Sequence, residues 1–208
     1  MLNKYKIKIC GLTDEKNFSE LKKYQIDYFG FIFYDKSPRY ILNNPNHSFI
    51  KEIKNKVAVF VNERIDAVLN ILEVYNFSYV QLHGNESSDY CRKLKEKGIK
   101  IIKSYLIMKE EDLKNIKMDK DSADYFLFDY KSDKYGGSGK TFDWEILNKK
   151  FFDKPYFLSG GLSLDNINNI NIIKGKEKPY CLDLNSKFEE SPGIKDIEKI
   201  SKLFNLNL

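Results

Sequence analysis

The sequence predicts an α/β protein of the (β/α)8 TIM-barrel class, compact and with short loops. Three observations carry this prediction. Short apolar runs alternate with longer segments of helical period, the runs number eight, and the length of 208 residues lies near the lower end of the range for such barrels. An open doubly wound sheet fits the same alternation, but the strand count favours the closed barrel. We expect one domain over residues 1–208.

The predicted strands are short runs rich in β-branched and aromatic residues. They cover Lys6–Cys10, Tyr28–Phe33, Val57–Val61, Tyr79–His83, Lys100–Leu106, Tyr125–Asp129, Tyr156–Ser159 and Tyr180–Leu184. Between them, apolar residues recur at three- and four-residue spacing, which predicts helices that cover the sheet with one face. These helical segments are Thr13–Tyr24, Arg64–Tyr75, Glu86–Lys97 and Ile194–Phe204.

Capping and turn residues predict where the elements begin and end. Asn62 and Asn85 precede two helical segments, where an asparagine side chain can cap free backbone N–H groups, and Gly98 stands where a helix should stop. The charged segment Lys109–Asp121 has few apolar residues and predicts a short or irregular helix. Two prolines and two adjacent asparagines in Asp35–Pro45 predict a long loop.

Composition narrows the classes of function. The net charge of +5 comes from lysines spread along the chain, a pattern that suits an anionic small molecule, and we expect no nucleic-acid partner. The mean hydropathy of −0.52 and the lack of a long apolar run predict no membrane partner and a cytoplasmic protein. Cys10, Cys91 and Cys181 are expected to be free thiols, because their number is odd and their spacing wide. We expect a monomer.

The first predicted strand ends in polar residues, and in a barrel the strand ends and the loops after them form the active site. Lys8 and Cys10 alternate with isoleucines, so both side chains should point into the barrel. The ammonium should lower the pKa of the Cys10 thiol and make it a usable base near neutral pH. The alternative is that Cys10 is a small buried hydrophobic residue.

The fourth and sixth predicted strands also end in titratable residues. Asp129 ends an apolar run, which should raise the pKa of its carboxyl group, and a partly protonated acid can donate a proton. The alternative is an aspartate that caps the following loop. Gln81 and His83 face inward together, so His83 either lines a pocket or has a structural role. No metal-ligand spacing joins His83 to His47, the other histidine, so we expect no metal.

Residues 136–140 and 159–161 form two glycine-rich segments whose backbone N–H groups a phosphate could approach closely. Barrels often bind phosphate with the loops after the seventh and eighth strands. Lys134 stands where the pattern GxxxxGK[ST] requires glycine, so nucleotide hydrolysis is not expected. Arg39, in the loop after the second strand, could close over the barrel mouth and clamp a carboxylate, or it is an ordinary surface arginine.

Seven motifs follow one another along the whole chain at the predicted strand ends. They are KICGLT (8–13), KSPR (36–39), VFVN (59–62), VQLHG (80–84), GGSGKTFDW (136–144), LSGGL (158–162) and SPGIKD (191–196). Together they resemble the phosphoribosylanthranilate isomerases of tryptophan biosynthesis. The resemblance implies an Amadori rearrangement of a phosphorylated small molecule, N-(5'-phosphoribosyl)anthranilate, without a cofactor.

The resemblance also implies roles for individual residues. Asp129 would protonate the ribose ring oxygen, and Cys10 would remove the proton from ribose C2. Arg39 would hold the anthranilate carboxylate, and Asp183 would contact the anthranilate amine or orient the ribose. Lys8, Gln81 and His83 complete the expected substrate contacts. The expected phosphate-binding residues are Gly137, Ser138, Gly139, Ser159, Gly160, Gly161, Asn185 and Ser186.

One departure from the family pattern concerns the loop after the eighth strand. The family usually reads Ser-Gly-Val-Glu, whereas residues 186–189 read Ser-Lys-Phe-Glu, so Lys187 either supplies a charge to the phosphate or points to solvent. Two other functions remain open. One is a different aminoaldose isomerase on the same barrel. Cys10, at a position where such an enzyme would have an aspartate base, argues against it. The other is a catalytically silent barrel that binds a phosphorylated ligand, against which the retained acid and base speak.

Overall fold

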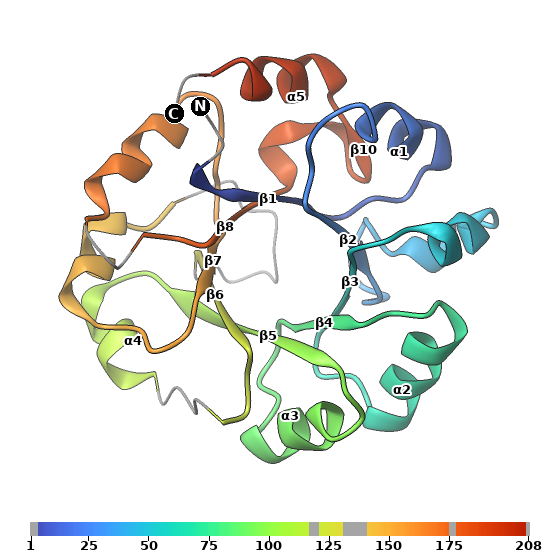
Figure 1. Cartoon of the computed structure of the whole chain (residues 1–208), viewed down its shortest axis with the longest axis horizontal. Helices are drawn as coiled ribbons and strands as arrows, with labels where there is room; N and C mark the ends of the chain where they lie inside the picture. Colours follow the sequence, from blue (N-terminus) through green and yellow to red (C-terminus); the bar gives the residue numbers. More distant parts are fainter. Residues whose placement is uncertain (1–3, 117–120, 131–140, 175–177, 207–208) are drawn as a thin grey trace.

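The computed structural model describes residues 4–116, 121–130, 141–174 and 178–206. Eight parallel strands close into a barrel in chain order (Figure 1). They are β1 (Lys6–Ile9), β2 (Tyr28–Ile32), β3 (Lys56–Phe60), β4 (Tyr79–Leu82), β5 (Lys100–Ile107), β6 (Tyr125–Tyr130), β7 (Tyr156–Leu158) and β8 (Cys181–Leu184). The predicted barrel is confirmed, and the open sheet is wrong, because β1 pairs with β8 over four residue pairs.

Each of the eight strands begins and ends within one residue of its predicted bounds. They were recognisable because both of their faces are buried, so each is a nearly continuous apolar run. The structure adds one element that was not predicted, an antiparallel hairpin of β9 (Glu189–Ser191) and β10 (Ile194–Lys195) after β8. Strands of three and two residues are too short to show a periodic pattern.

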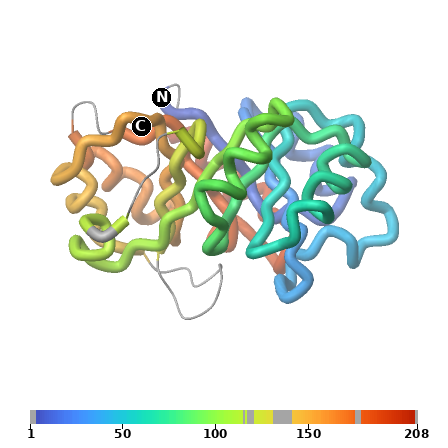
Figure 2. The backbone as a smooth tube through the Cα atoms, turned by 90° about the horizontal axis from the view of Figure 1, so that it is seen from below, coloured from blue at the N-terminus to red at the C-terminus, as the bar shows by residue number. Residues whose placement is uncertain are grey.

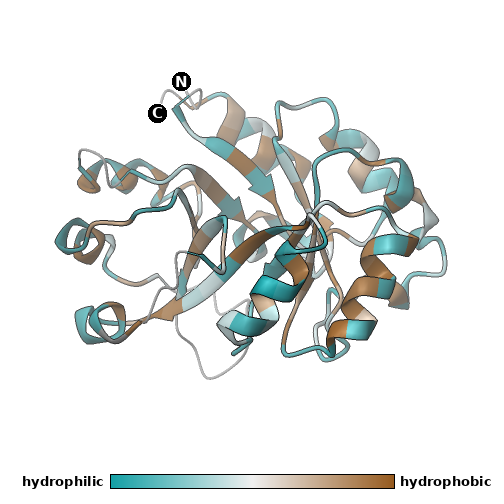
Figure 3. Ribbon diagram, turned by 60° about the horizontal axis from the view of Figure 1, so that its bottom comes forward, coloured by the Kyte–Doolittle hydropathy of each residue, from teal (hydrophilic) through white to brown (hydrophobic). Residues whose placement is uncertain are grey.

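Five α-helices lie outside the barrel in the described part of the chain, and in Figure 3 they carry both apolar and polar bands. They are α1 (Glu15–Leu21), α2 (Ile65–Val74), α3 (Ser88–Lys95), α4 (Glu110–Asn115) and α5 (Ile197–Phe204). The four predicted helices are confirmed with shorter bounds, and α4 is short, as expected for Lys109–Asp121. Gly98 follows α3, and its N–H bonds the Lys95 carbonyl, so the predicted stop is also confirmed.

Three connections use short 3-10 segments in place of α-helices. They are η3 (His47–Glu52) after β2, η4 (Trp144–Lys149) after β6 and η5 (Ile167–Ile172) after β7. Another, η2 (Ile41–Asn43), lies inside the predicted loop Asp35–Pro45. Figure 2 shows α2 and α3 on one side of the barrel and the η4–η5 region on the other. No helix among the described residues is long and apolar enough to cross a membrane.

The two predicted asparagine caps are wrong. Arg64 is the N-cap of α2, and Ser87 is the N-cap of α3, where its hydroxyl accepts the Tyr90 N–H at 3.2 Å. Asn62 instead has a left-handed backbone with φ of 52°. Its side-chain oxygen accepts the backbone N–H of Asn85 at 2.6 Å, which ties the loop after β3 to the loop after β4. The Asn62 side chain therefore caps the loop after β4 rather than a helix.

The amino-terminal end of the barrel interior is filled by an apolar cluster, here called the lower layer. It comprises Tyr28, Val57, Ile102, Leu127, Phe157 and Cys181, with Tyr79, Tyr125 and Tyr180 packed around it. The hydroxyl oxygens of Tyr28 and Tyr180 lie 3.0 Å apart, so the two phenols satisfy each other inside this cluster. The lower layer closes the barrel from below, and any site inside it must open at the other end.

Candidate active site

A cavity opens at the carboxyl ends of the strands and brings together most of the predicted site residues. The space between its walls is about 860 Å³, which includes open solvent at the mouth. Its lining includes Cys10, Arg39, Gln81, His83, Asp129, Ser159, Gly160, Gly161, Asp183, Asn185, Ser186 and Lys187. Gly137, Ser138 and Gly139 lie outside the described residues. Lys8 is described but does not line the cavity.

Lys8 faces inward as predicted, but it lies below the cavity and is fully buried. Its Nζ atom lies 2.9 Å from both carboxylate oxygens of Asp183 and 2.8 Å from Oε1 of Gln81. Burial alone would lower the pKa of Lys8, but the Asp183 carboxylate raises it, so the ammonium stays charged. These contacts occupy its donors, which does not fit the predicted direct contact with substrate. Lys8 supports residues that line the cavity.

Cys10 lies at the end of β1, and its thiol is 4% exposed. Burial raises the pKa of the thiol, and the Asp183 charge adds to this, while Lys8 lowers it. The predicted lowering of the Cys10 pKa is therefore wrong, because burial of the thiol outweighs the effect of the Lys8 ammonium, and the Asp183 carboxylate adds to the rise. Gly30 on β2 makes room for the thiol, since a Cβ atom there would lie 2.7 Å from Sγ. The sequence analysis missed Gly30, although an isolated glycine inside a strand is a signal of close approach.

Asp129 lies near the end of β6, with its side chain 15% exposed. Burial raises the pKa of its carboxyl group to about 6, the predicted direction, although the Tyr130 N–H at 2.7 Å from Oδ1 opposes the shift. Gly160 allows the end of β7 to approach this carboxyl group. Its φ is +88°, and a Cβ atom there would lie 2.8 Å from Oδ1 of Asp129. The loop after β7 therefore packs directly against the carboxyl group.

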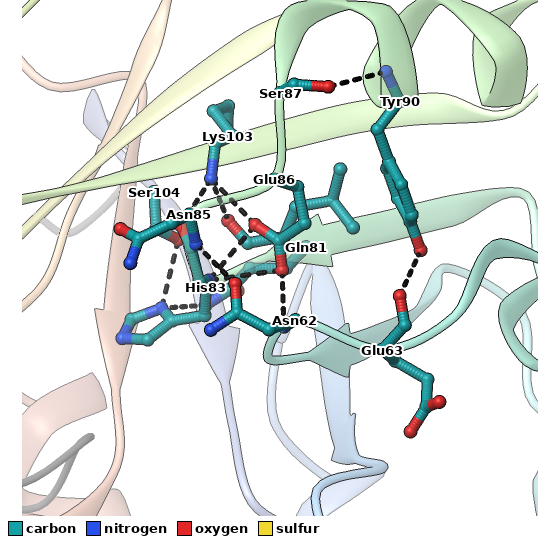
Figure 4. A network of polar contacts seen from close by, with 12 residues as sticks. Asn62, Glu63, Gln81, His83, Asn85, Glu86, Ser87, Tyr90, Lys103 and Ser104 are labelled. Carbon is teal, nitrogen blue, oxygen red and sulfur yellow. Dashed lines mark hydrogen bonds and ion pairs between the residues drawn. The ribbon is translucent and has the colours of Figure 1, made fainter.

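His83 and Gln81 connect Asp129 to the interior of the barrel, and Figure 4 shows the contacts of these two side chains with each other and with Ser104. Nε2 of Gln81 lies 3.1 Å from Nδ1 of His83, and the Ser104 hydroxyl lies 2.9 Å from the same nitrogen. The other ring nitrogen, Nε2, lies 3.4 Å from Oδ2 of Asp129. Burial lowers the pKa of His83 to about 4, so the ring is neutral near pH 7.

The loop that follows His83 is held by a buried ion pair that the sequence analysis missed. Lys103 on β5 donates to Oε2 of Glu86 at 2.8 Å and to the Gly84 carbonyl at 2.6 Å (Figure 4). The Glu86 carboxylate also accepts the Asn62 N–H at 2.8 Å. Because these groups are 2–9% exposed, the pair is shielded from solvent and ties the end of β4 to the neighbouring strands.

A second buried network lies at the cavity mouth and includes Arg39. Glu189 in β9 accepts from Nε of Arg39 at 2.9 Å and from Nη2 at 2.6 Å, while Lys195 donates to Glu189 at 2.7 Å. This side-on pairing leaves the Nη1–Nη2 end of the guanidinium group for a ligand. Lys195 also donates to Oδ1 of Asn185 at 2.8 Å, which leaves the amide nitrogen of Asn185 for a ligand. Glu189 and Lys195 were not predicted as site residues.

Comparison with known proteins identifies the family. A sequence model described as N-(5'-phosphoribosyl)anthranilate (PRA) isomerase matches residues 7–206. The chain belongs to this family. Curated N-(5'-phosphoribosyl)anthranilate isomerases of Parabacteroides distasonis and Phocaeicola vulgatus are 38% and 37% identical to it. The alignments cover 93% of this chain and 89% of the first relative, and 96% of both chains for the second.

Solved structures of phosphoribosyl anthranilate isomerases share the fold. The Thermotoga maritima protein has a TM-score of 0.82 and 34% identity, with 96% of both chains covered. Another member was solved in complex with reduced 1-(o-carboxyphenylamino)-1-deoxyribulose 5-phosphate, and it has a TM-score of 0.78, 29% identity and 96% coverage of both chains. A further structure is of monomers generated from the dimeric Thermotoga maritima protein, and it has a TM-score of 0.78, 30% identity to this chain and 96% coverage of both chains. Both oligomeric forms therefore occur among these relatives, and a monomer stays a prediction here.

Family membership confirms the resemblance, but it assigns no role to single residues of this chain. The structure places Cys10, Asp129, Gln81, His83 and Asp183 around one cavity, as expected from their strand ends. The loops after β7 and β8 line another part of it, with Ser159, Gly160, Gly161, Asn185, Ser186 and Lys187. Their phosphate contacts stay predictions. No cluster of His, Cys, Asp or Glu suited to a metal occurs among the described residues.

Proposed function

We propose that this phosphoribosylanthranilate isomerase family member acts in tryptophan biosynthesis. It would convert N-(5'-phosphoribosyl)anthranilate into 1-(2-carboxyphenylamino)-1-deoxyribulose 5-phosphate. The observation that carries the proposal is that an inward thiol, Cys10, and a carboxyl group of raised pKa, Asp129, line one cavity. The names of its relatives and the product analogue bound to one of them support the choice of substrate.

Asp129 is the general acid in this proposal. The bond between ribose C1 and the ring oxygen breaks, and its electron pair goes to the oxygen, which takes the proton from Asp129. The lone pair of the anthranilate nitrogen then forms the C1=N bond of a Schiff base. A carboxyl group with a pKa of about 6 retains a useful protonated fraction near neutral pH, which an ordinary aspartate does not.

Cys10 is the general base. Its thiolate takes the proton from ribose C2, the C2–H electrons form C1=C2, and the electrons of C1=N go to the nitrogen. The resulting enol-amine tautomerises to the ketone, so the substrate's own nitrogen serves as electron sink and no cofactor is needed. Because burial raises the thiol pKa, the active form of the free protein combines an ionised Cys10 with a protonated Asp129.

The active form, with Cys10 ionised and Asp129 protonated, determines how kcat/KM depends on pH. Below about pH 6, kcat/KM rises with pH as the fraction of thiolate grows while Asp129 stays protonated. Between the two pKa values, the gain in thiolate balances the loss of protonated carboxyl group, which gives a plateau. The lower limb of the profile therefore reports the pKa of Asp129, although Asp129 is the acid.

The remaining lining residues bind the substrate. The free end of the Arg39 guanidinium holds the anthranilate carboxylate, and Asp183 contacts the amine or the ribose. The phosphate lies against Ser159, Gly160, Gly161, Asn185 and Ser186, while the expected contacts of Gly137, Ser138 and Gly139 lie outside the described residues. Lys8 contributes indirectly by charge and position. We further propose that the protein is cytoplasmic and acts as a monomer, with a phosphorylated small molecule as its partner.

A turnover assay that follows anthranilate fluorescence tests the proposal. Cys10→Ala and Asp129→Asn should each lower kcat/KM by about 10²–10⁴-fold, the usual contribution of a general acid or base. Cys91→Ala is the matched control, because Cys91 is also a buried free cysteine but lies on α3, away from the cavity. Absence of turnover by the wild type, or full activity of both site variants, would overturn the proposed function.

A further inference from the structure

A continuous row of polar contacts runs from the Lys8 ammonium below the cavity to Asp129 in its lining. Lys8 lies 2.8 Å from Oε1 of Gln81, and Nε2 of Gln81 lies 3.1 Å from Nδ1 of His83. Nε2 of His83 then lies 3.4 Å from Oδ2 of Asp129. Lys8 lies on β1, Gln81 lies on β4 and His83 directly follows β4, and the row ends at Asp129 on β6.

The chemistry of these groups allows one direction of donation along the row. An ammonium group can only donate, so the amide oxygen of Gln81 must face Lys8 and the amide nitrogen must face His83. An amide N–H can donate to Nδ1 only if Nδ1 carries no hydrogen. The neutral ring therefore carries its hydrogen on Nε2, the nitrogen that faces Asp129. The Ser104 hydroxyl, 2.9 Å from Nδ1, acts as a second donor to the same lone pair.

The charges around His83 do not favour a protonated ring. Besides Asp129, the charged groups that face it are Asp183 and Lys8 below and Lys103 and Glu86 beside it. These four groups form two ion pairs with each other at 2.9 Å and 2.8 Å. A second ring proton on Nδ1 would also meet the hydrogens of the Gln81 amide. Neutral His83 is thus the form that this site accepts.

We propose that His83 is a positioning residue for Asp129, held by Gln81 with its hydrogen on Nε2. Lys8 orients the Gln81 amide and so fixes the tautomer from the far end of the row. The Tyr130 N–H already holds Oδ1 of Asp129 at 2.7 Å, and the His83 N–H holds Oδ2, so both carboxyl oxygens keep a fixed direction. A contact of 3.4 Å is long, as catalytic hydrogen bonds often are before substrate binds. The catalytic meaning of this arrangement rests on the proposed function, whereas the tautomer does not.

Long-range ¹H–¹⁵N NMR of the two histidines tests the tautomer directly. His47→Gln removes the other ring, which contacts the Tyr75 hydroxyl, and so assigns the signals. At pH 7 we expect Nδ1 of His83 to show the shift of an unprotonated nitrogen and Nε2 that of a protonated one. A ring with its hydrogen on Nδ1, or a doubly protonated ring, would overturn the inference.

Gln81→Glu tests whether residue 81 sets the tautomer. A carboxylate has almost the same shape as the amide but only accepts, so it would attract a hydrogen to Nδ1 of His83. We expect the spectrum to change to an Nδ1-protonated ring. An unchanged spectrum in this variant would show that Gln81 does not control the ring. Neither measurement needs substrate, so both decide the inference even if the proposed activity is absent.

Kinetics of His83→Asn and His83→Gln test positioning. A glutamine amide nitrogen can reach the place of Nε2, whereas the shorter asparagine cannot. We expect His83→Asn to lower kcat about tenfold to hundredfold, the cost of a misplaced catalytic group, with a smaller change in KM. The lower limb of its kcat/KM profile should move to higher pH, because the ionised carboxyl group loses a donor.

His83→Gln should keep most of the activity and the wild-type profile, and thermal melts would establish that both variants fold. Equal losses in both variants, or an unmoved lower limb in His83→Asn, would overturn the positioning role. Lack of turnover in the wild type would instead count against the proposed function, and the NMR result would still stand.

Discussion

Along single strands, the inward side chains change from aromatic and aliphatic at the amino end to titratable at the carboxyl end. On β6 the series is Tyr125, Leu127 and Asp129, and along β4 and the residue that follows it the series is Tyr79, Gln81 and His83. The first members belong to the lower layer, and the last members line the cavity. Residues two positions apart on a strand therefore share the inward face, and their order along the strand determines how deep in the barrel each one lies.

The lower layer stabilises the protein. The carboxyl end of the barrel, here called the upper end, holds the cavity with Cys10 and Asp129 and carries the chemistry. The lower layer buries large rings with one satisfied hydroxyl pair, and such burial contributes favourably to folding. The upper end holds a thiol and a carboxyl group whose pKa values are both raised by burial, so their ionised forms destabilise the fold. We expect changes in the lower layer to act on stability and changes in the upper end to act on turnover.

The largest expected effect on stability comes from Phe157→Ala in the lower layer. Phe157 is 1% exposed, and its ring lies 5.6 Å from the rings of both Tyr28 and Tyr125. The truncation should lower the free energy of unfolding by about 3–5 kcal/mol through lost burial and a cavity. Urea denaturation measures this. Ser159→Ala, two residues further on and just past the end of β7, is the matched control and should leave stability nearly unchanged. A fall in kcat of the still folded Phe157→Ala protein would contradict the expectation that the lower layer acts on stability and not on turnover.

The next effect is a gain of stability from Asp129→Asn at the upper end. A pKa of about 6 in the fold, against about 3.9 in an unfolded chain, makes the ionised carboxyl group unfavourable by up to roughly 3 kcal/mol. The raised pKa means that the folded state binds the proton more tightly, so the contribution of Asp129 to stability falls as pH rises from about 4 to about 6. The Asp129→Asn variant has no ionisable group at this position, so its stability does not fall for this reason as pH rises.

Unfolding experiments on the Asp129→Asn and wild-type proteins across this pH range test the effect. The variant should be nearly as stable as the wild type at pH 4 and more stable at pH 7. A stability difference that does not change with pH would mean that Asp129 ionises as an ordinary surface carboxyl group.

Gly30→Ala tests how closely the upper end packs around the proposed base, because it places one methyl group beside the Cys10 thiol. The Cβ atom would lie 2.7 Å from the Cys10 sulfur, closer than real contacts allow, so the thiol must move. We expect kcat to fall about tenfold to hundredfold with a modest loss of stability. Gly98→Ala is the opposite control: no atom lies within 4 Å of its Cβ position, but its φ of +80° strains an alanine. It should lose stability and keep kcat, and an equal kcat in both variants would contradict a close fit at Cys10.

The sequence predicted what local patterns determine. Strand bounds, the inward direction of Cys10 and the raised pKa of Asp129 all follow from an apolar run and a period of two. The sign of the Cys10 pKa shift was missed because it depends mainly on how deeply the folded barrel buries the thiol, and secondly on Asp183, which lies far along the chain. Arg39 and Glu189 are likewise 150 positions apart. No local pattern connects such partners, and the same holds for the Asn62–Asn85 contact that replaced two predicted caps.

The smallest expected effect concerns Lys187, where the family usually has glycine. The side chain is exposed and lines the cavity beside Asn185 and Ser186. If its ammonium contacts the substrate phosphate, Lys187→Gly should raise KM about threefold to tenfold without a change in kcat, as expected for the loss of one exposed charge contact. The wild-type KM should also rise with salt more steeply than that of the variant, because salt screens exposed charges. Lys23→Gly, shortly after the end of α1 and also exposed, is the control for net charge. An unchanged KM in Lys187→Gly would place the ammonium in solvent and leave phosphate binding to the backbone and to the neutral side chains of the two loops.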